Sequence, residues 1–207
     1  FGLDAALRLI VRDSDEFLFR VRPGDLVRGT AAGRVIESKL SGYEVGEYVL
    51  ASGGVQNYIA CGPGELERCD VSQAPLEAWL GGFGVSGLTA YFALIKECKP
   101  QPGHTILVNG AAGAVGSIAG QIAKFAGATV IGLTGSEEKC DWLVNELGYD
   151  IAINYKDSDW YDQLVTAAPD RLDFIFDNVG GEVLDLSLKL IAMRGMVLLC
   201  GSTSQYA

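Results

Sequence analysis

From residue 105 onward, two patterns of apolar and polar positions alternate along the chain. Short apolar runs without strict alternation are typical of strands buried on both faces of a parallel sheet. Such runs cover residues 105–109, 129–133, 151–154, 173–177 and 196–200. Between them, apolar residues recur with helical spacing over about 114–125, 137–147, 160–167 and 181–191. Strands joined by helices through right-handed crossovers predict an α/β fold with a doubly wound parallel sheet.

Residues 1–75 show a different pattern, in which short alternating runs are separated by glycine and proline. This pattern predicts strands and is typical of part of a small β-barrel. The expected strands cover residues 18–21, 33–38, 46–50 and 55–60.

The pattern changes near Gln73, after which helices are predicted over 76–80 and 88–95. The second of these helices carries an apolar stripe, and two prolines follow it. The stripe consists of Leu88, Tyr91, Phe92 and Ile95. We therefore divide the chain into a first domain over 1–80 and a second over 81–207.

The most informative stretch is the glycine-rich turn after the strand at 105–109. Gly110, Gly113 and Gly116 stand at three-residue spacing before a predicted helix. The N-terminus of a helix offers N–H groups and the positive end of its dipole to a phosphate, and glycines allow close approach. Gly113, Ala114, Val115 and Gly116 are therefore predicted to bind the diphosphate of a dinucleotide. The alternative is a glycine- and alanine-rich turn that only packs closely.

Composition excludes several classes of function. Hydrophobic residues make up 49% and charged residues 20%, which is typical of a globular protein. The net charge of −10 disfavours binding to a nucleic-acid backbone. No signal peptide and no run of about 18 apolar residues is present, so no membrane association is expected.

The cysteines and the histidine limit the chemistry further. Five scattered cysteines without Cys-x-x-Cys favour a reducing compartment, for which we predict the cytoplasm. His104 is the only histidine, so neither a metal site nor a Ser-His-Asp triad is expected. No lysine of the P-loop type follows the glycines. The chain starts at Phe1 and stops soon after a strand, so we expect both ends to continue in a longer protein.

The segment after the second strand of the sheet indicates which dinucleotide is bound. An acidic residue there would hold the ribose 2′-hydroxyl of NAD, but Gly135 and Ser136 occupy this position. Their N–H groups, the Ser136 hydroxyl and Lys139 suit the 2′-phosphate of NADP. The alternative is that Glu137 or Glu138 meets the hydroxyl of NAD. Ser136 is also expected to be the N-cap of the next helix, a role that it could have without binding a phosphate.

Further candidates follow the other strands, because the carboxyl ends of parallel strands face the ligand crevice. Asn178 suits ribose or nicotinamide, or else it caps the next helix as part of a turn. Tyr155 suits the adenine or the phosphate, or else it is a loop tyrosine on the surface. Gly201 and Ser202 follow the last strand, after Cys200, which is expected to be a buried thiol.

Several of these motifs together resemble a known family. The chain is similar to the zinc-independent medium-chain dehydrogenases/reductases of the leukotriene B4 12-hydroxydehydrogenase, prostaglandin reductase and curcumin reductase type. The matching motifs stand at 87–91, 109–117 (NGAAGAVGS), 135–139 (GSEEK), 154–156 (NYK), 176–181 (FDNVGG) and 200–206 (CGSTSQY), with 33–38 and 45–46 in the first domain.

The resemblance implies a Rossmann domain over 81–207 that lacks its last strand, preceded over 1–80 by part of a GroES-like β-barrel domain. It implies NADPH-dependent reduction of the C=C bond of α,β-unsaturated ketones or aldehydes, with hydride delivered to the β-carbon. Lys139 and Tyr155 match residues at the 2′-phosphate, and Asn178 matches one near the nicotinamide. Tyr206 matches a tyrosine near the nicotinamide ribose and is the candidate proton donor. A homodimer of the full-length protein is also expected from the family.

The sequence departs from the family on the substrate side. A substrate-side tyrosine of the family is absent from residues 3–8, where Ala6 stands, and Val55 replaces an aromatic residue. If these losses are real, a non-catalytic NADP-binding or interaction protein is a rival function. A second rival is an NADPH quinone reductase of the same superfamily, whose nucleotide motifs would barely differ.

Overall fold

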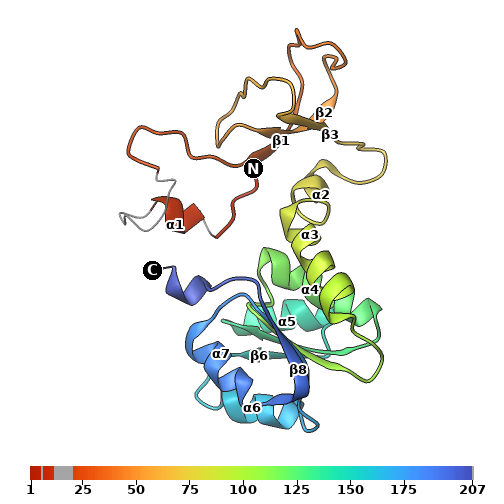
Figure 1. Ribbon diagram of the computed structural model, residues 1–207, viewed down its shortest axis with the longest axis vertical. Helices are drawn as coiled ribbons and strands as arrows, with labels where there is room; N and C mark the ends of the chain where they lie inside the picture. Colours follow the sequence, from red (N-terminus) through yellow and green to blue (C-terminus); the bar gives the residue numbers. More distant parts are fainter. Residues whose placement is uncertain (6, 12–20, 207) are drawn as a thin grey trace. The chain divides into compact units, whose positions relative to one another are not determined.

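The computed structural model describes residues 1–5, 7–11 and 21–206, and its contacts divide the chain into two compact units, Phe1–Val85 and Ser86–Ala207. The first unit contains α1 (Leu7–Val11), β1 (Thr30–Arg34), β2 (Tyr48–Ser52), β3 (Leu66–Arg68) and α2 (Leu76–Leu80) (Figure 1). Its three strands form an antiparallel sheet in the order β1-β2-β3. Ala31, Val49 and Ala51 are the buried residues of this sheet.

Several strand predictions in the first unit were wrong. β1 and β2 are displaced from the expected 33–38 and 46–50, β3 was not expected, and residues 55–60 form no strand. The ladder of β1 and β2 ends at Thr30 and Ser52, because the N–H groups of Gly53 and Gly54 both turn to the carbonyl of Gly29. Residues 18–20 of the strand expected at 18–21 lie outside the described residues.

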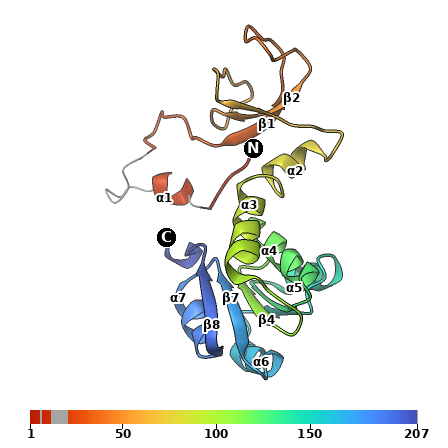
Figure 2. The same cartoon turned by 45° about the vertical axis from the view of Figure 1, so that its right-hand side comes forward.

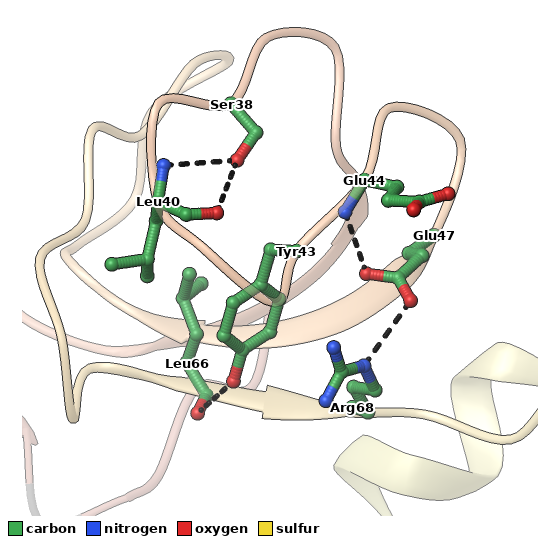
Figure 3. Close-up of polar contacts among 7 residues, drawn as sticks. All are labelled: Ser38, Leu40, Tyr43, Glu44, Glu47, Leu66 and Arg68. Carbon is green, nitrogen blue, oxygen red and sulfur yellow. Dashed lines mark hydrogen bonds and ion pairs between the residues drawn. The ribbon is translucent and has the colours of Figure 1, made fainter.

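The loop between β1 and β2 is fixed onto β3 by polar contacts (Figure 3). The Tyr43 hydroxyl donates to the carbonyl of Leu66 at 3.1 Å, and the Arg68 guanidinium lies 4.5 Å from the centre of the Tyr43 ring. Glu47 accepts from the backbone N–H of Glu44 at 2.9 Å and from Arg68 at 3.2 Å. These donors hold the pKa of Glu47 below its usual value, with the N–H of Glu44 as the larger cause.

The second unit is built on a five-stranded parallel sheet with the order β6-β5-β4-β7-β8. Figure 2 shows β4, β7 and β8 side by side. The strands are β4 (Thr105–Asn109), β5 (Thr129–Thr134), β6 (Ile151–Asn154), β7 (Leu172–Asp177) and β8 (Ile191–Leu199). The helices are α3 (Val85–Tyr91), the π-helical η1 (Phe92–Cys98), α4 (Ala114–Phe125), α5 (Glu137–Asn145), α6 (Trp160–Ala167), α7 (Gly181–Leu188) and the 3₁₀ turn η2 (Thr203–Gln205).

Two apolar layers hold helices against both faces of this sheet. Ile106 and Val108 of β4 pack with α4, α5 and η1, whereas Leu107 packs on the opposite face with residues of α6 and α7. All three side chains are fully buried. The absence of strict alternation in the sequence is explained by burial on both faces. The predicted α/β fold with a doubly wound parallel sheet, preceded by part of a β-barrel domain, is confirmed.

The last helix and strand differ from the prediction. α7 ends at Leu188 and β8 begins at Ile191, so the expected helix over 181–191 is shorter and the expected strand over 196–200 is longer. A bulge divides β8, because its register against β7 shifts between Leu172 and Phe174. Arg194, which has φ +67, lies in the bulge. The glycine and methionines around the bulge concealed this strand from sequence reasoning.

The apolar stripe expected over 88–95 does not face the core. Leu88, Tyr91, Phe92 and Ile95 are 37–54% exposed in the isolated chain. The buried face of α3 and η1 consists instead of Gly87, Ala90, Leu94 and Cys98. The last three belong to the same apolar cluster as residues of α4. Of the helices that the structure describes, none has both the length and the apolar character needed to cross a membrane.

Candidate functional site

Every residue predicted to bind a cofactor lies in the second unit, after the carboxyl end of a strand. Because the strands are parallel, these ends share one edge of the sheet. β4 lies between β5 and β7, so the chain direction across the sheet reverses at β4. In open α/β sheets, ligands bind at this switch point. The predicted residues follow β4 (Gly113–Gly116), β5 (Gly135, Ser136, Lys139), β6 (Tyr155), β7 (Asn178) and β8 (Gly201, Ser202, Tyr206).

The glycine turn after β4 packs so closely on the start of α4 that Gly116 has no room for a side chain. Gly110 has φ +65, and its carbonyl accepts the N–H of Gly113 at 3.0 Å. A Cβ on Gly116 would collide with the Gly110 carbonyl oxygen and lie 2.9 Å from the Cα of Ala111. Gly113 caps α4 without a side-chain hydrogen bond, so the first-turn N–H groups of the helix remain available to a ligand.

The buried side chain of Tyr149, which sequence reasoning missed, supports this turn through a hydrogen bond. Its side chain is 2% exposed, and its hydroxyl donates to the carbonyl of Gly116 at 2.7 Å. Its ring lies directly against Gly120 of α4 and Gly132 of β5. Burial raises the pKa of the Tyr149 hydroxyl well above its usual value, so this group acts as a neutral donor. Gly120 and Gly132, which face this one large residue, were the signal in the sequence from which the contact could have been predicted.

A second group of predicted residues follows β5 and β6. The N–H of Tyr155 donates to the carbonyl of Thr134 at 2.9 Å, which joins the two strand ends. The Tyr155 hydroxyl lies 2.9 Å from the position that a Cβ on Gly135 would take. Ser136 precedes α5, but its side chain makes no capping hydrogen bond. Ser136 is thus the N-cap residue of α5 by position, as one of the two readings predicted, and its hydroxyl remains available to a ligand.

The charges beside Ser136 are exposed. Lys139 lies in the first turn of α5, and within the described ranges it forms no ion pair. Glu137 and Glu138 are also exposed in this turn. Acidic residues in the first turn stabilise a helix N-terminus whether or not they also bind a ligand. The presence of Glu137 and Glu138 therefore does not distinguish NAD from NADP.

A buried polar network joins the ends of β4 and β7. Asp177 is 1% exposed and accepts from the Asn109 amide at 2.9 Å, from the N–H of Gly180 at 2.9 Å and from the N–H of Val179 at 3.3 Å. Asn178 donates its amide to the Asn109 carbonyl at 2.8 Å. The Asn178 side chain does not cap α7, because its amide turns to β4, whereas Gly180 of the same turn occupies the N-cap of α7.

The segment after β8 folds back onto this network. The carbonyl of Asn178 accepts from the N–H and the hydroxyl of Thr203, at 3.2 and 3.1 Å. The Tyr206 hydroxyl accepts the N–H of Ser202 at 3.3 Å and lies 3.5 Å from the position of a Cβ on Gly201. Cys200, which was expected to be buried, is exposed, because β8 ends at Leu199.

The structure therefore brings the candidates together in two groups. Asn178, Gly201, Ser202 and Tyr206 gather beside the glycine turn, where a Cβ on Gly110 would lie 3.4 Å from the Cβ of Asn178. Gly135, Ser136, Lys139 and Tyr155 form the second group around the end of β5. The N–H of Ala111 donates to the Leu133 carbonyl at 3.0 Å and so ties the glycine turn to β5.

The substrate-side positions lie in the first unit. Ala6 is outside the described residues, and Val55 is 40% exposed. The first unit also contains an apolar cavity of about 820 Å³, lined by residues of β1, β2 and the loops 35–43 and 56–61. None of the predicted cofactor residues lines it, since all of them belong to the second unit. In the described part of the chain, no three His, Cys, Asp or Glu side chains gather in a way that could hold a metal ion.

The second unit fits a phosphorylated dinucleotide on its own geometry. The glycine turn gives a diphosphate open access to the first-turn N–H groups of α4. The second group adds a hydroxyl that is not used as a cap, a tyrosine hydroxyl and an ammonium group without a carboxylate partner among the described residues. Each of these groups can donate a hydrogen bond, as a phosphate dianion requires.

Comparisons with known proteins indicate which family the chain is similar to. A family described as the N-terminal domain of oxidoreductase matches residues 1–69, and a family described as zinc-binding dehydrogenase matches residues 114–207. Prostaglandin reductase 1 of Oryctolagus cuniculus is 42% identical over 191 residues, which cover 90% of this chain and 54% of the relative. (+)-Pulegone reductase of Mentha piperita is 36% identical over 190 residues, which cover 90% of this chain and 56% of the relative.

A solved structure is similar over almost the whole chain. The crystal structure of CurA in complex with NADPH from Vibrio vulnificus superimposes with a TM-score of 0.90 at 36% identity. The match covers 99% of this chain and 61% of CurA. The chain thus spans between half and two thirds of the length of these relatives.

Proposed function

Because the chain belongs to the zinc-independent medium-chain dehydrogenases/reductases of the prostaglandin reductase type, we propose that the protein is an NADPH-dependent enzyme. It reduces the C=C bond of α,β-unsaturated ketones or aldehydes. The observation that carries the proposal is the shared carboxyl edge of the sheet. There the glycine turn and the group around Ser136 offer donors for two separate phosphates. The names of prostaglandin reductase, pulegone reductase and NADPH-bound CurA support it.

The residues of this chain have distinct parts in the proposed mechanism. Gly113, Ala114, Val115 and Gly116 hold the diphosphate with backbone N–H groups. Gly135, Ser136, Lys139 and Tyr155 hold the 2′-phosphate, and Asn178, Gly201 and Ser202 lie toward the nicotinamide. NADPH, when bound, supplies a hydride to the β-carbon of the substrate. Tyr206 holds a proton at its hydroxyl for the α-carbon.

Steady-state assays with NADPH and either an enone or a quinone test the proposal. We expect turnover with the enone and little with the quinone. Turnover with the quinone alone would assign the protein to quinone reduction instead. Tight NADPH binding without turnover of either substrate would indicate a binding or interaction protein. The homodimer and the cytoplasmic location stay predictions.

Lys139→Ala is expected to weaken NADPH binding by about tenfold, the loss of one charge-assisted contact to phosphate. Binding of NADH should change less than twofold, because NADH has no 2′-phosphate. The measurement is the dissociation constant of each dinucleotide from titration of protein fluorescence. Lys96→Ala, which removes an exposed lysine on η1, is the matched control. Equal losses for both dinucleotides would remove Lys139 from the 2′-phosphate site.

Tyr206→Phe is expected to lower kcat with the enone by about tenfold. This is less than the roughly hundredfold or more that is usual for general acid catalysis, because water also reaches the half-buried side chain. The KM for NADPH should stay unchanged. Tyr58→Phe, at a 76% exposed tyrosine in the first unit, is the control. An unchanged kcat for Tyr206→Phe would assign the proton to water.

A further inference from the structure

Lys156 follows Tyr155 in the turn after β6, and its side chain reaches the end of β5. Its Cε lies 3.4 Å from the position that a Cβ on Gly135 would take, beside the Tyr155 hydroxyl at 2.9 Å. The two side chains therefore cover the Gly135 backbone together. Ser136, the next residue, carries the hydroxyl that makes no capping hydrogen bond.

The turn that carries Lys156 is fixed by its own hydrogen bonds. The N–H of Lys156 donates to the side-chain oxygen of Asn154 at 3.2 Å, and the Asn154 amide donates to Asp157 at 3.0 Å. The N–H of Asp157 donates to the Asn154 carbonyl at 3.1 Å. This network fixes the backbone of the turn that carries Lys156. It also engages Asp157, the nearest acid in sequence, with an amide.

The charge of Lys156 is not balanced by a neighbour. Within residues 21–206, Lys124 pairs with Asp150 at 2.6 Å, whereas neither Lys156 nor Lys139 forms an ion pair. Because the whole chain has a net charge of −10, two lysines without acidic partners at the end of one strand are unusual. Lys139 approaches from α5 and Lys156 from the turn after β6, with Gly135 and Ser136 following β5, the strand beside β6.

We propose that Lys156 is a second cation for the 2′-phosphate and, with Lys139, sets the preference for NADPH over NADH. This inference rests on the proposed NADPH-dependent function. A phosphate monoester carries close to two negative charges at pH 7. Two ammonium groups on separate elements match that charge, and Tyr155 and Lys156 together cover the backbone of Gly135, the residue before Ser136.

The test compares Lys156→Ala and Lys156→Arg with Lys189→Ala, which removes an exposed lysine after α7, away from the carboxyl edge. The probes are NADPH, NADH and adenosine 2′,5′-bisphosphate, and the readout is the dissociation constant. We expect Lys156→Ala to weaken NADPH and the bisphosphate by about fivefold, the upper range of an exposed charge pair. NADH should change less than twofold, Lys156→Arg should retain most of the affinity, and Lys189→Ala should have no effect.

Two outcomes separate failure of this inference from failure of the proposed function. If wild-type protein prefers NADPH and Lys139→Ala weakens it, but Lys156→Ala binds NADPH like wild type, Lys156 has no part in the site. An equal loss of NADPH and NADH in Lys156→Ala would also overturn it, because it would indicate a structural role. If wild-type protein binds neither dinucleotide, the proposed function itself fails, and the inference fails with it.

Discussion

Asp177→Ala is expected to lower the free energy of unfolding by about 3–4 kcal/mol, because it leaves buried donors without an acceptor. The Asp177 carboxylate accepts from the Asn109 amide and from the N–H groups of Val179 and Gly180, and it is 1% exposed. Each bond to a charged acceptor contributes about 1.5–3 kcal/mol, and partial access of water after the substitution reduces the sum. Urea denaturation of the purified protein measures the loss.

Two variants define the cause of that loss. Asp177→Asn keeps the shape and one acceptor oxygen but turns an NH2 group toward a donor, so about half of the loss is expected. Asp173→Ala removes a carboxylate from the same strand that, among the described residues, accepts one hydrogen bond, from the N–H of Thr105 at 2.8 Å. This carboxylate is half-buried and water can replace it in part, so the substitution should cost about 1 kcal/mol. If Asp177→Ala cost no more than Asp173→Ala, the network would not stabilise the edge of the sheet.

Gly120→Ala is expected to destabilise the protein by about 2 kcal/mol, although alanine favours a helix by about 1 kcal/mol over glycine. The new Cβ would overlap the ring of Tyr149, which is buried and lies against Gly132 on the side of β5. The ring has to move, and its hydrogen bond to the Gly116 carbonyl is then lost. Thermal and urea unfolding measure the effect, and NADPH affinity should fall with it.

A double-mutant cycle isolates the contact with Tyr149. In a Tyr149→Ala background the ring is absent, so Gly120→Ala should become neutral or stabilising, as helix propensity alone predicts. Ser117→Ala, at a half-exposed position of the same helix, should stay within about 0.5 kcal/mol of wild type. A loss from Gly120→Ala of the same size in both backgrounds would contradict the assigned overlap.

The parallel half of the fold could be predicted because its signals are local. Runs such as Ile106–Val108 are apolar over their whole length. The glycine turn then marks the point where the strand pattern ends and the helical pattern begins. Once the strands are parallel, the loops after β4, β5, β6, β7 and β8 must share one edge. That edge holds the positions selected from the sequence, and their roles stay predictions.

The features that were not predicted from the sequence depend on contacts between residues far apart in the chain, which no local pattern records. Tyr149 looks like a loop residue until α4 brings Gly120, 29 residues earlier, against its ring. Asp177 looks like an exposed acid at a strand end until Asn109 and Gly180 surround it. In the first unit the strands are three to five residues long, and their ends are set by turns such as the one at Gly53 and Gly54. Alternation over so few residues defines no boundary.

The order of strands in the sheet also affects how the protein folds. Ile106 of β4 pairs with Val130 of β5, 24 residues later, and with Phe174 of β7, 68 residues later. Chain entropy makes closure of the longer loop about 1 kcal/mol more costly, and contacts far apart in sequence slow folding. During synthesis, β4, β5 and β6 leave the ribosome before β7, and their exposed edge stays uncovered until β7 arrives. The crevice at β4 and β7 is therefore completed late, after the glycine turn that forms one side of it.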